Sequence, residues 1–392
     1  MLGTTFSPWP SFTDEEADAV RNVILSNKVN YWTGQEAREF EREFATWAGT
    51  DYAVALTNGT VALDLALVAL GIGKGDEVIV TSRTFLASVS SIINSGATPV
   101  FADVDLDSQN FTAKSIEAVL TPRTRALICV HLAGWPCDMD PIMQIAAQHD
   151  LKVIEDCAQA HGAYYKGRPV GSIGHIGAWS FCQDKIMTTG GEGGMVTTND
   201  RELWSRMWAY KDHGKSWEAV YERSHAPGFR WLHESFGTNW RMMEVQAAIG
   251  RIQLRRMQEW QASRSRNLQS IWDAARCLLA LRVPDFPKDN VHAAYKCYVF
   301  VRQECLKDGW SRDRILNEIA SRGVPAFSGS CSEVYLEKAF DNTGLRPAQR
   351  LSNAKELGDS SMMFLVHPTL TASEIDLTCK VLSDVMRLAS VQ

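Results

Sequence analysis

The chain has 392 residues, 45% hydrophobic and 22% charged, a globular composition with enough apolar residues for one large domain and a smaller one. Its formal net charge of −6 gives no reason to expect a nucleic-acid partner. Residues 1–16 contain no basic segment followed by an apolar one, and no apolar run approaches the length of a membrane span, so we expect a cytoplasmic protein without a signal peptide.

The first half of the chain alternates between strand-like and helix-like segments. Thr13 is followed by Glu16 at the capping-box spacing, which predicts the start of a helix. Strands are predicted at 52–56, 77–80, 99–104, 126–131, 151–157, 177–181 and 194–198, and helices at 60–70, 84–96 and 140–150. Strands separated by helices at such spacing predict a mostly parallel sheet covered by helices, an α/β fold.

Beyond residue 200 the alternation stops. Residues 211–238 show little periodicity and are rich in His, Gly, Trp and Arg. A loop of that length is usually functional or reaches a neighbouring molecule. Apolar residues spaced by three and four then predict a helix over 239–261, and 295–303 and 361–368 are strand-like.

These patterns predict a large α/β domain at 1–260, which includes the N-terminal segment, and a smaller C-terminal α+β domain at 261–392. A run of arginines falls around the boundary, and we interpret it as a solvated helix face: Arg251, Arg255, Arg256, Arg264 and Arg266.

The nine cysteines and nine histidines are scattered along the chain. No Cys-x-x-Cys pair occurs, and no His/Cys cluster has the spacing of zinc ligands. We therefore expect reduced, buried thiols and no metal site.

Residues able to bind a phosphate and a flat ring follow the first two predicted strands. Ligands of a parallel α/β sheet collect at the carboxyl ends of its strands. Gly59 and Thr60 open a helix there, where free backbone amides and a hydroxyl would bind phosphate, unless Thr60 is an ordinary N-cap. Phe85 follows the second strand and would either stack on a planar ring or belong to the core.

An acid and a lysine follow two later strands. Asp156 ends the strand 151–157, with Gln159 just beyond, and a buried acid is costly unless it is paired or caps the next turn. Ser180 ends the following strand, and Lys185 stands before a cluster of glycines. Lys185 is either a reactive amine or a surface lysine beside a turn. An amine, a carboxylate, a flat aromatic ring and phosphate donors are together what a pyridoxal phosphate site requires.

The sequence resembles the sugar aminotransferases of the DegT type, a family of fold type I pyridoxal phosphate enzymes. The motifs that carry the resemblance span nearly the whole chain in the family's order: TNGTVALDLAL, GKGDEVIVTSRTF, GATPVFADVD, IEDCAQAHGA, SFCQDKIMTTGGEGGMVTTND, DHG, NWRMMEVQAAIGRIQL and VHPTLT. The resemblance implies a mostly parallel seven-stranded large domain, a small C-terminal domain, and a homodimer whose active sites lie at the interface.

The resemblance also implies a role for each candidate residue. Lys185 is similar to the lysine that forms the Schiff base with pyridoxal 5′-phosphate, and Asp156 to the partner of the pyridine nitrogen. The remaining roles are cofactor contacts: Gln159 near the ring and its 3-oxygen, Phe85 stacked on the ring, Gly59, Thr60 and Ser180 at the phosphate, and Asn239 at the phosphate of the other subunit. His161 is either close to the cofactor or a hydrogen-bonded histidine behind the site.

Two segments depart from the family's pattern, and both fall where the sugar is expected. Cys182-Gln183-Asp184 replaces a histidine that many members have after the Ser-Phe pair, and residues 327–340 replace a Tyr-Pro-Pro-like segment. Related dehydratases have a histidine in place of the lysine, so Lys185 favours transamination.

We therefore expect an enzyme that moves an amino group from L-glutamate, through pyridoxamine phosphate, to a keto-sugar. The expected acceptor is a 4-keto-6-deoxy nucleotide sugar used in surface polysaccharide synthesis. The alternatives are a 3-keto sugar, a keto-octulosonate, another pyridoxal phosphate reaction such as dehydration, or a cofactor-binding regulator without turnover.

Overall fold

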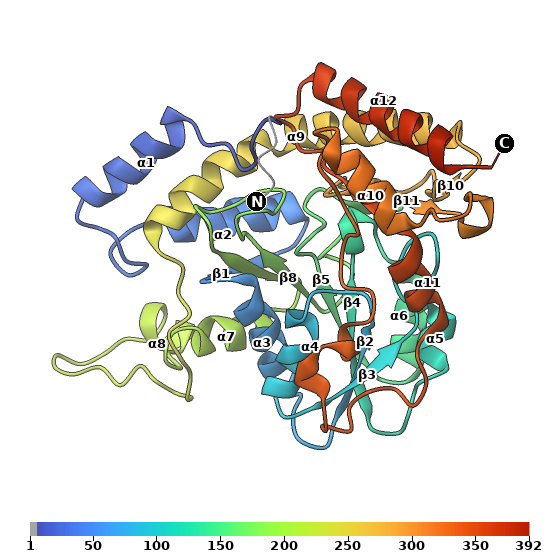
Figure 1. The fold of residues 1–392 in the computed structure, drawn as a ribbon. Coiled ribbons are helices and arrows are strands. Elements are labelled where there is room, and N and C mark those ends of the chain that lie inside the picture. The colour runs from blue at the N-terminus through green and yellow to red at the C-terminus, as the bar shows by residue number, and fades with distance from the viewer. Residues whose placement is uncertain (1–5, 392) are drawn as a thin grey trace.

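The computed structural model describes residues 6–391 (Figure 1). Residues 1–5 and residue 392 lie outside the described residues. The prediction that residues 1–16 are not a signal peptide therefore falls partly on residues that the structure does not describe. Within residues 6–391 no helix combines the length and the apolar character that crossing a bilayer would require.

A seven-stranded sheet forms the centre of the large domain. Its strands are β1 (Tyr52–Leu56), β2 (Glu77–Thr81), β3 (Thr98–Ala102), β4 (Thr124–Val130), β5 (Lys152–Asp156), β8 (Ile176–Ser180) and β9 (Gly194–Thr198). Their order is β1-β9-β8-β5-β4-β2-β3, and β9 runs antiparallel to both of its neighbours. The predicted mostly parallel seven-stranded sheet is confirmed, and its short apolar strands are buried on both faces, as parallel strands require.

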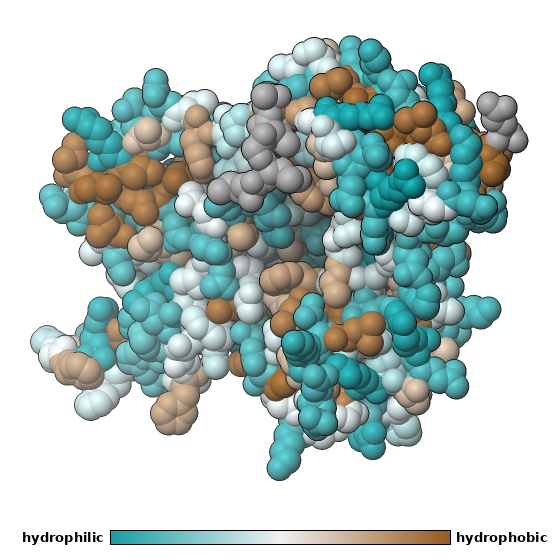
Figure 2. Space-filling model, in the orientation of Figure 1, coloured by the Kyte–Doolittle hydropathy of each residue, from teal (hydrophilic) through white to brown (hydrophobic). Residues whose placement is uncertain are grey.

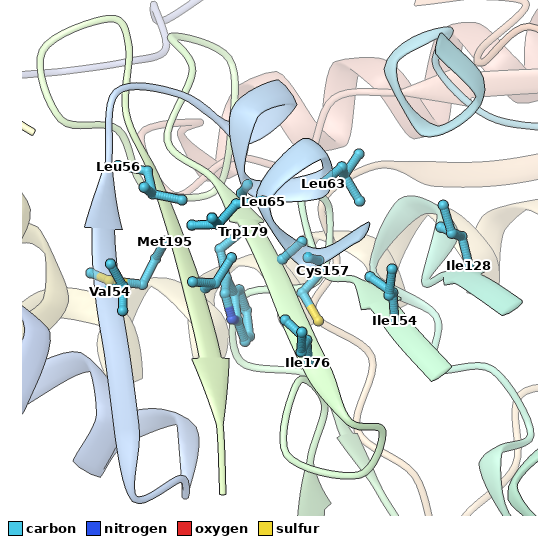
Figure 3. Packing of buried hydrophobic residues seen from close by; sticks show 14 of the residues in the cluster. Val54, Leu56, Leu63, Leu65, Ile128, Ile154, Cys157, Ile176, Trp179 and Met195 are labelled. Carbon is cyan, nitrogen blue, oxygen red and sulfur yellow. The ribbon is translucent and has the colours of Figure 1, made fainter. Parts of the chain in front are cut away.

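Helices cover the two faces of this sheet. The helices of this part of the chain are α1 (Asp14–Leu25), α2 (Glu36–Ala48), α3 (Gly59–Ala69), α4 (Ala87–Asn94), α5 (Ala113–Glu117), α6 (Met139–Gln148), α7 (Arg201–Tyr210) and α8 (Trp217–Tyr221). Thr13 and Glu16 form the predicted capping box of α1. Figure 3 shows Leu63 and Leu65 of α3 above side chains of the sheet such as Trp179 and Met195, all of them buried. This packing fixes the start of α3 at the carboxyl edge of the sheet.

The C-terminal region folds around a second, antiparallel sheet. Its strands are β10 (Leu281–Arg282), β11 (Cys297–Val301), β12 (Ala326–Phe327) and β13 (Ser361–Phe364), in the order β10-β11-β13-β12. Its helices are α10 (Arg312–Ser321), α11 (Ser352–Ser360) and α12 (Ala372–Ala389). The minor elements of the chain are the hairpin β6 (Tyr164–Tyr165) and β7 (Arg168–Pro169), and the short 3-10 turns η1 (Leu132–Gly134), η2 (Gln303–Cys305), η3 (Val334–Leu336) and η4 (Lys338–Phe340). The predicted smaller α+β unit is therefore present.

One long helix joins the two regions. Helix α9 (Glu244–Arg276) has 33 residues, packs on α1 and α2 near its start, and contacts β10, β11 and α12 further along (Figure 1). The proposed boundary between residues 260 and 261 falls inside this helix. Helix α9 contributes residues to the cores of both regions. The division of the chain into two domains at that position remains a prediction.

The interpretation of the arginine run as a solvated face is wrong for one residue. Arg251 pairs with Glu36 and Glu43, and Arg255 and Arg256 both pair with Glu15. Arg264 is only 1% exposed and lies against the ring of Trp9, 4.9 Å from its centroid. The turn of α9 that carries Arg264 faces the interior because the N-terminal segment and the small domain cover it there.

Residues 211–238 form a projecting arm rather than a compact loop. Its first residues, Lys211 and Asp212, are buried in the body, helix α8 follows, and the segment after α8 extends away from the body at the lower left of Figure 1. Three large side chains on this arm, Phe229, Trp231 and Phe236, are 78%, 82% and 100% exposed. Its expected contact with a neighbouring molecule remains a prediction.

Candidate active site

A cavity of about 620 Å³ opens at the carboxyl ends of β1, β5 and β8. Seven of the eight predicted site residues line it: Gly59, Thr60, Phe85, Asp156, Gln159, Ser180 and Lys185. Asn239 does not line this cavity. It is exposed, and its backbone forms an isolated antiparallel β-bridge with that of Asp212 at the base of the arm. The structure therefore places seven candidates in one site of a single chain.

The start of α3 forms a cradle for an anionic group. Asn58, and not Thr60, caps the helix, because its Oδ1 accepts a hydrogen bond of 3.0 Å from the Val61 amide. The amides of Gly59 and Thr60 belong to the first turn, where the helix offers them no partner. A β-carbon on Gly59 would stand 2.5 Å from the β-carbon of Ser180, so only glycine allows this close approach. The alternative interpretation of Thr60 as the N-cap is wrong.

Asp156 is a buried carboxylate held by two donors. Its Oδ2 accepts a hydrogen bond of 2.8 Å from Ser88 Oγ, and its Oδ1 accepts one of 3.1 Å from the Ala158 amide. Burial raises the pKa of Asp156 above its ordinary value, although these two hydrogen bonds and the Lys185 charge oppose the shift. The alternative interpretation of Asp156 as a cap for the following turn therefore applies to Oδ1, which accepts the Ala158 amide. A cationic ring nitrogen in the cavity would supply the opposite charge that this carboxylate lacks.

Lys185 lies inside the cavity rather than on the surface. Its side chain is only 17% exposed, and Nζ stands 3.7 Å from Asp184 Oδ1. Trp9 fixes the backbone at this point by donating a hydrogen bond of 2.8 Å from Nε1 to the Lys185 carbonyl. In the glycine-rich loop that follows, a β-carbon on Gly193 would lie 2.0 Å from Thr189 Oγ1. The loop therefore packs closely beside the lysine, and the surface-lysine alternative is wrong.

Phe85 and Gln159 lie between this cavity and a second one. Phe85 is 71% exposed and lines both cavities, so the core interpretation of Phe85 is wrong. Gln159 Oε1 accepts a hydrogen bond of 2.8 Å from the Ala133 amide, and the side-chain NH₂ has no partner among residues 6–391. An aromatic face and an amide donor are the groups expected beside a planar ring with an oxygen substituent.

The second cavity, of about 590 Å³, adjoins the first. It shares Lys185 and Asp184 with the first cavity and adds residues of the small domain: Tyr295, Lys296, Phe327, Gly329, Ser330, Cys331, Val334, Glu337, Met363 and Leu365. Residues of both segments that depart from the family's pattern line these cavities, and the expected sugar contact there remains a prediction. This open cavity, with polar and apolar residues in its wall, adjoins Lys185 and has room for a small molecule.

Several residues that line the two cavities were missed from the sequence. Ser88 lies in the first turn of α4, four residues after Thr84 in the preceding loop, and the two hydroxyls lie 2.8 Å apart. Tyr295 and Lys296 come from the small domain, more than a hundred residues after Lys185, and carried no motif. Backbone hydrogen bonds of the 293–296 segment with Ala133 and Gly134 hold them at the site.

His161 is buried behind the cavity. Its ring packs on Trp179 and Phe181, with centroids 5.3 and 5.7 Å away. Burial lowers its pKa to about 3, so the ring is neutral. Neither ring nitrogen has a hydrogen-bond partner among residues 6–391. His161 therefore lies behind the site, but without the hydrogen bond that the alternative interpretation assigned to it.

One group of possible metal ligands lies within the described residues: His131, Glu155 and Cys157. His131 Nδ1 accepts from the Cys137 amide, so the Nε2 proton is directed to Glu155 Oε2, 3.0 Å away. Glu155 also accepts hydrogen bonds from the amides of Gly171, Ile173 and Gly174. These hydrogen bonds satisfy His131 and Glu155, so the close approach of the two side chains does not require a metal ion.

The residues of the first cavity fit pyridoxal phosphate. The Gly59 cradle, which a β-carbon would fill, matches the phosphate, and the Asp156 carboxylate matches the pyridine nitrogen. Lys185 Nζ has no hydrogen-bond partner among the described residues and faces the same space.

Comparison with known proteins places this site in a family. Residues 10–383 match the model of the DegT/DnrJ/EryC1/StrS aminotransferase family. The chain is 37% identical to a GDP-perosamine synthase of Caulobacter vibrioides, over 93% of this chain and 95% of that protein. It is 41% identical to a UDP-N-acetyl-3-dehydro-alpha-D-glucosamine 3-aminotransferase of Acidithiobacillus ferrooxidans, over 72% of this chain and 73% of that protein.

Solved structures have the same fold. An aminotransferase from Psychrobacter cryohalolentis is 66% identical, with a TM-score of 0.96 over 98% of this chain and 99% of that one. A putative sugar aminotransferase from Streptococcus pneumoniae, solved in its PLP form, is 25% identical, with a TM-score of 0.85 over 98% of both chains. The fold type I architecture and pyridoxal phosphate as cofactor are thereby confirmed.

Proposed function

The chain belongs to the DegT/DnrJ/EryC1/StrS aminotransferase family of pyridoxal phosphate enzymes, and on that premise we propose that it transfers the amino group of L-glutamate to a 4-keto-6-deoxy nucleotide sugar. The proposal places the reaction in the cytoplasm, in the synthesis of a surface polysaccharide. The observation that supports it is the position of Lys185, which lines the cofactor cavity and the adjoining cavity of about 590 Å³ at the same time.

The described residues have distinct tasks in such a reaction. Bound pyridoxal phosphate supplies a ring that accepts the electrons of a broken C–H bond. Asp156, oriented by Ser88, stabilises a proton on the ring nitrogen. Lys185 Nζ takes the proton from the α-carbon of the donor as a general base and later returns one to the sugar carbon. Because donor and acceptor use the same lysine in turn, we expect ping-pong kinetics.

The acceptor is the part of the proposal with the most alternatives. The relatives include a perosamine synthase and a 3-aminotransferase, so a 3-keto sugar is the main competitor, followed by a keto-octulosonate. Lys185 favours transamination over dehydration. Seven of the eight predicted cofactor residues line the cavity, which favours an enzyme over a regulator without turnover.

The proposed functional unit is a homodimer with shared active sites. The support is the arm 211–238, whose large apolar side chains are exposed in the isolated chain, and Asn239 at its base. Figure 2 shows a further apolar area at the upper left over α1, where Ile24 and Leu25 are 55% and 62% exposed. Exposed apolar surface of this kind marks contact sites between proteins.

A panel of keto-sugars tests the acceptor. The purified protein, loaded with cofactor, is incubated with L-glutamate and with 4-keto-6-deoxy and 3-keto nucleotide sugars, and products are identified by mass spectrometry. We expect amination of a 4-keto sugar. Exclusive amination of a 3-keto sugar would reject the proposed acceptor, and loss of water without amination would reject transamination.

A further inference from the structure

Lys296 is a partly buried lysine beside the reactive one that has no partner of its own. Its ammonium group makes no hydrogen bond and no ion pair within 4 Å to any residue from 6 to 391. Burial lowers its pKa to about 8, with the charges of Arg264 and Lys185 acting in the same direction and that of Asp184 in the opposite one. An unpaired cation in a cavity wall is costly, which suggests an anion that comes and goes.

Tyr295 places Lys296 next to Lys185. The two ammonium groups lie 4.8 and 5.4 Å from the centre of the Tyr295 ring, and the Tyr295 hydroxyl donates to Asp184 Oδ2. Both lysines therefore lie against one aromatic side chain, within reach of a single small molecule. Asp184, the carboxylate whose charge acts on Lys296, already accepts a hydrogen bond from the Tyr295 hydroxyl and lies beside Lys185.

The backbone that carries Lys296 is held in an unusual conformation. Ala133 and Ala294 both have positive φ angles, 58° and 51°, in the left-handed region that is unfavourable for a residue with a side chain. The Tyr295 amide donates to the Ala133 carbonyl over 3.0 Å, and the Ala133 amide donates to Gln159 of the cofactor cavity. Strain of this kind persists where surrounding contacts enforce it, often at functional sites.

The charged and titratable groups that face Lys296 come from several elements. They are Asp184 and Lys185 from the segment after β8, Tyr295 beside it, Arg264 from α9, His367 after β13, and Glu337 across the cavity. Burial lowers the pKa of His367 to about 3, so this ring is neutral. Arg264 Nε and Nη2 also lack partners among the described residues. The neighbourhood is thus rich in positive charge.

We infer that Lys296 binds a carboxylate of the amino donor, an assignment that rests on the proposed aminotransferase function and adds a residue to it. In an amino acid the α-carboxylate is one carbon from the nitrogen that is transferred. The diphosphate of a nucleotide sugar is separated from its keto carbon by the sugar ring. A cation that shares an aromatic ring with the reactive lysine fits the carboxylate better.

The test measures binding of glutarate, a dicarboxylate without an amino group, to the cofactor-loaded enzyme by calorimetry. We expect Lys296→Met to weaken glutarate binding about tenfold or more, the scale of losing a charged hydrogen bond. Native binding should weaken as pH rises through about 8, where Lys296 loses its proton, and Lys296→Arg should retain tight binding above that pH. Lys380→Met, an exposed lysine of α12, is the matched control.

Two further measurements decide between the sources of the anion. Conversion of the bound cofactor to its amino form by L-glutamate and by L-alanine is followed by absorbance. If Lys296→Met slows this conversion with both donors, Lys296 binds the α-carboxylate. If it slows the conversion with L-glutamate alone, Lys296 binds the side-chain carboxylate. Binding of a nucleoside diphosphate should be unchanged.

Native glutarate affinity in Lys296→Met, with an unchanged melting temperature and cofactor absorbance, would overturn the inference. So would weakened binding of the nucleoside diphosphate alone. If Lys296→Met does not fold, Lys296→Arg and the pH dependence of the native enzyme decide, and binding that is flat through pH 8 overturns the inference. Failure to aminate any keto-sugar, with the donor results as stated, would reject only the proposed acceptor.

Discussion

Ser88 donates a hydrogen bond of 2.8 Å to Asp156, and this contact joins the helix after β2 to the acid at the end of β5. It fixes one carboxylate oxygen of a buried group whose pKa is already raised by desolvation. The carboxylate is therefore oriented before any ligand enters. Orienting a charge in advance is the main way a site stabilises a charged transition state.

Asp156→Asn should separate catalysis from stability. We expect a loss of about 2–4 kcal/mol of transition-state stabilisation, measured as kcat, because the charge facing the ring nitrogen is removed. The raised pKa means that the folded, cofactor-free protein holds the Asp156 proton more tightly than the unfolded chain does. Asp156 then costs stability above the ordinary carboxyl pKa, so the Asn variant should melt higher at neutral pH. An Asn variant with nearly native kcat would reject the role.

Lys185→Ala should abolish turnover while the cofactor still binds. The native protein should be yellow, borohydride should remove the visible absorbance, and the modified peptide should contain residue 185. The cradle at Gly59 and the Asp156 carboxylate remain intact in the variant, so cofactor binding measured by equilibrium dialysis should persist. A variant that transaminates at the native rate would show that another amine is reactive.

Gly59→Ala should weaken cofactor binding. The new β-carbon would stand 2.5 Å from the Ser180 β-carbon, and overpacking of this kind costs about 1–3 kcal/mol. We expect a dissociation constant for pyridoxal phosphate that is about tenfold to a hundredfold higher. Gly73→Ala is the control, because its β-carbon would approach only the Ser95 carbonyl oxygen, at 3.4 Å. Equal affinity of the two variants for pyridoxal phosphate would show that the start of α3 at Gly59 does not bind the phosphate.

Glu155→Gln should destabilise the fold without touching the cavity. Burial alone would raise the Glu155 pKa, but His131 and the amides of Gly171 and Gly174 outweigh it and lower the pKa. We expect a loss of about 3 kcal/mol in the free energy of unfolding at neutral pH, the scale of breaking a buried pair. A lowered pKa gives stability that is present above the ordinary carboxyl pKa and lost as the pH falls.

The difference between native protein and Glu155→Gln should therefore shrink in acid, in denaturant titrations at several pH values. The exposed Glu117 provides a control, since Glu117→Gln should leave stability unchanged. A chelator should not change the melting temperature, because the His131 and Glu155 atoms already have partners. A large decrease on chelation would point to an ion in this cluster.

Mixing two inactive variants tests the shared active site. If Asn239 serves the partner's phosphate, Lys185→Ala and Asn239→Ala subunits should regain activity when mixed, since one of the two sites in the hybrid is then complete. If Asn239→Ala alone is too active for the test, the bulky Asn239→Trp replaces it. The recovered activity should follow the hybrid population, measured by native mass spectrometry. Verified exchange without activity, or a monomer by light scattering, would reject the shared site.

The cofactor half of the site could be predicted from the sequence because its residues follow strands that the alternating pattern located. Gly59, Asp156 and Lys185 each stand at a strand end, and the sheet brings such ends together. The second cavity, which includes Tyr295 and Lys296, could not be predicted. Tyr295 and Lys296 reach the site through contacts of the 293–296 segment with Ala133, and no local pattern encodes a contact so distant in the sequence. Arg264 was misplaced for the same reason, because helical periodicity does not show that a distant N-terminal tryptophan covers it.

Helix α9 has a consequence for how this chain can be divided or recombined. Its 33 residues extend over about 50 Å, and its two ends are built into different cores. A chain cut between residues 260 and 261 would leave each fragment with part of a helix and an uncovered apolar stripe. Chimaeras that exchange the C-terminal region between relatives therefore need their crossover after Arg276, so that the whole of α9 comes from one parent.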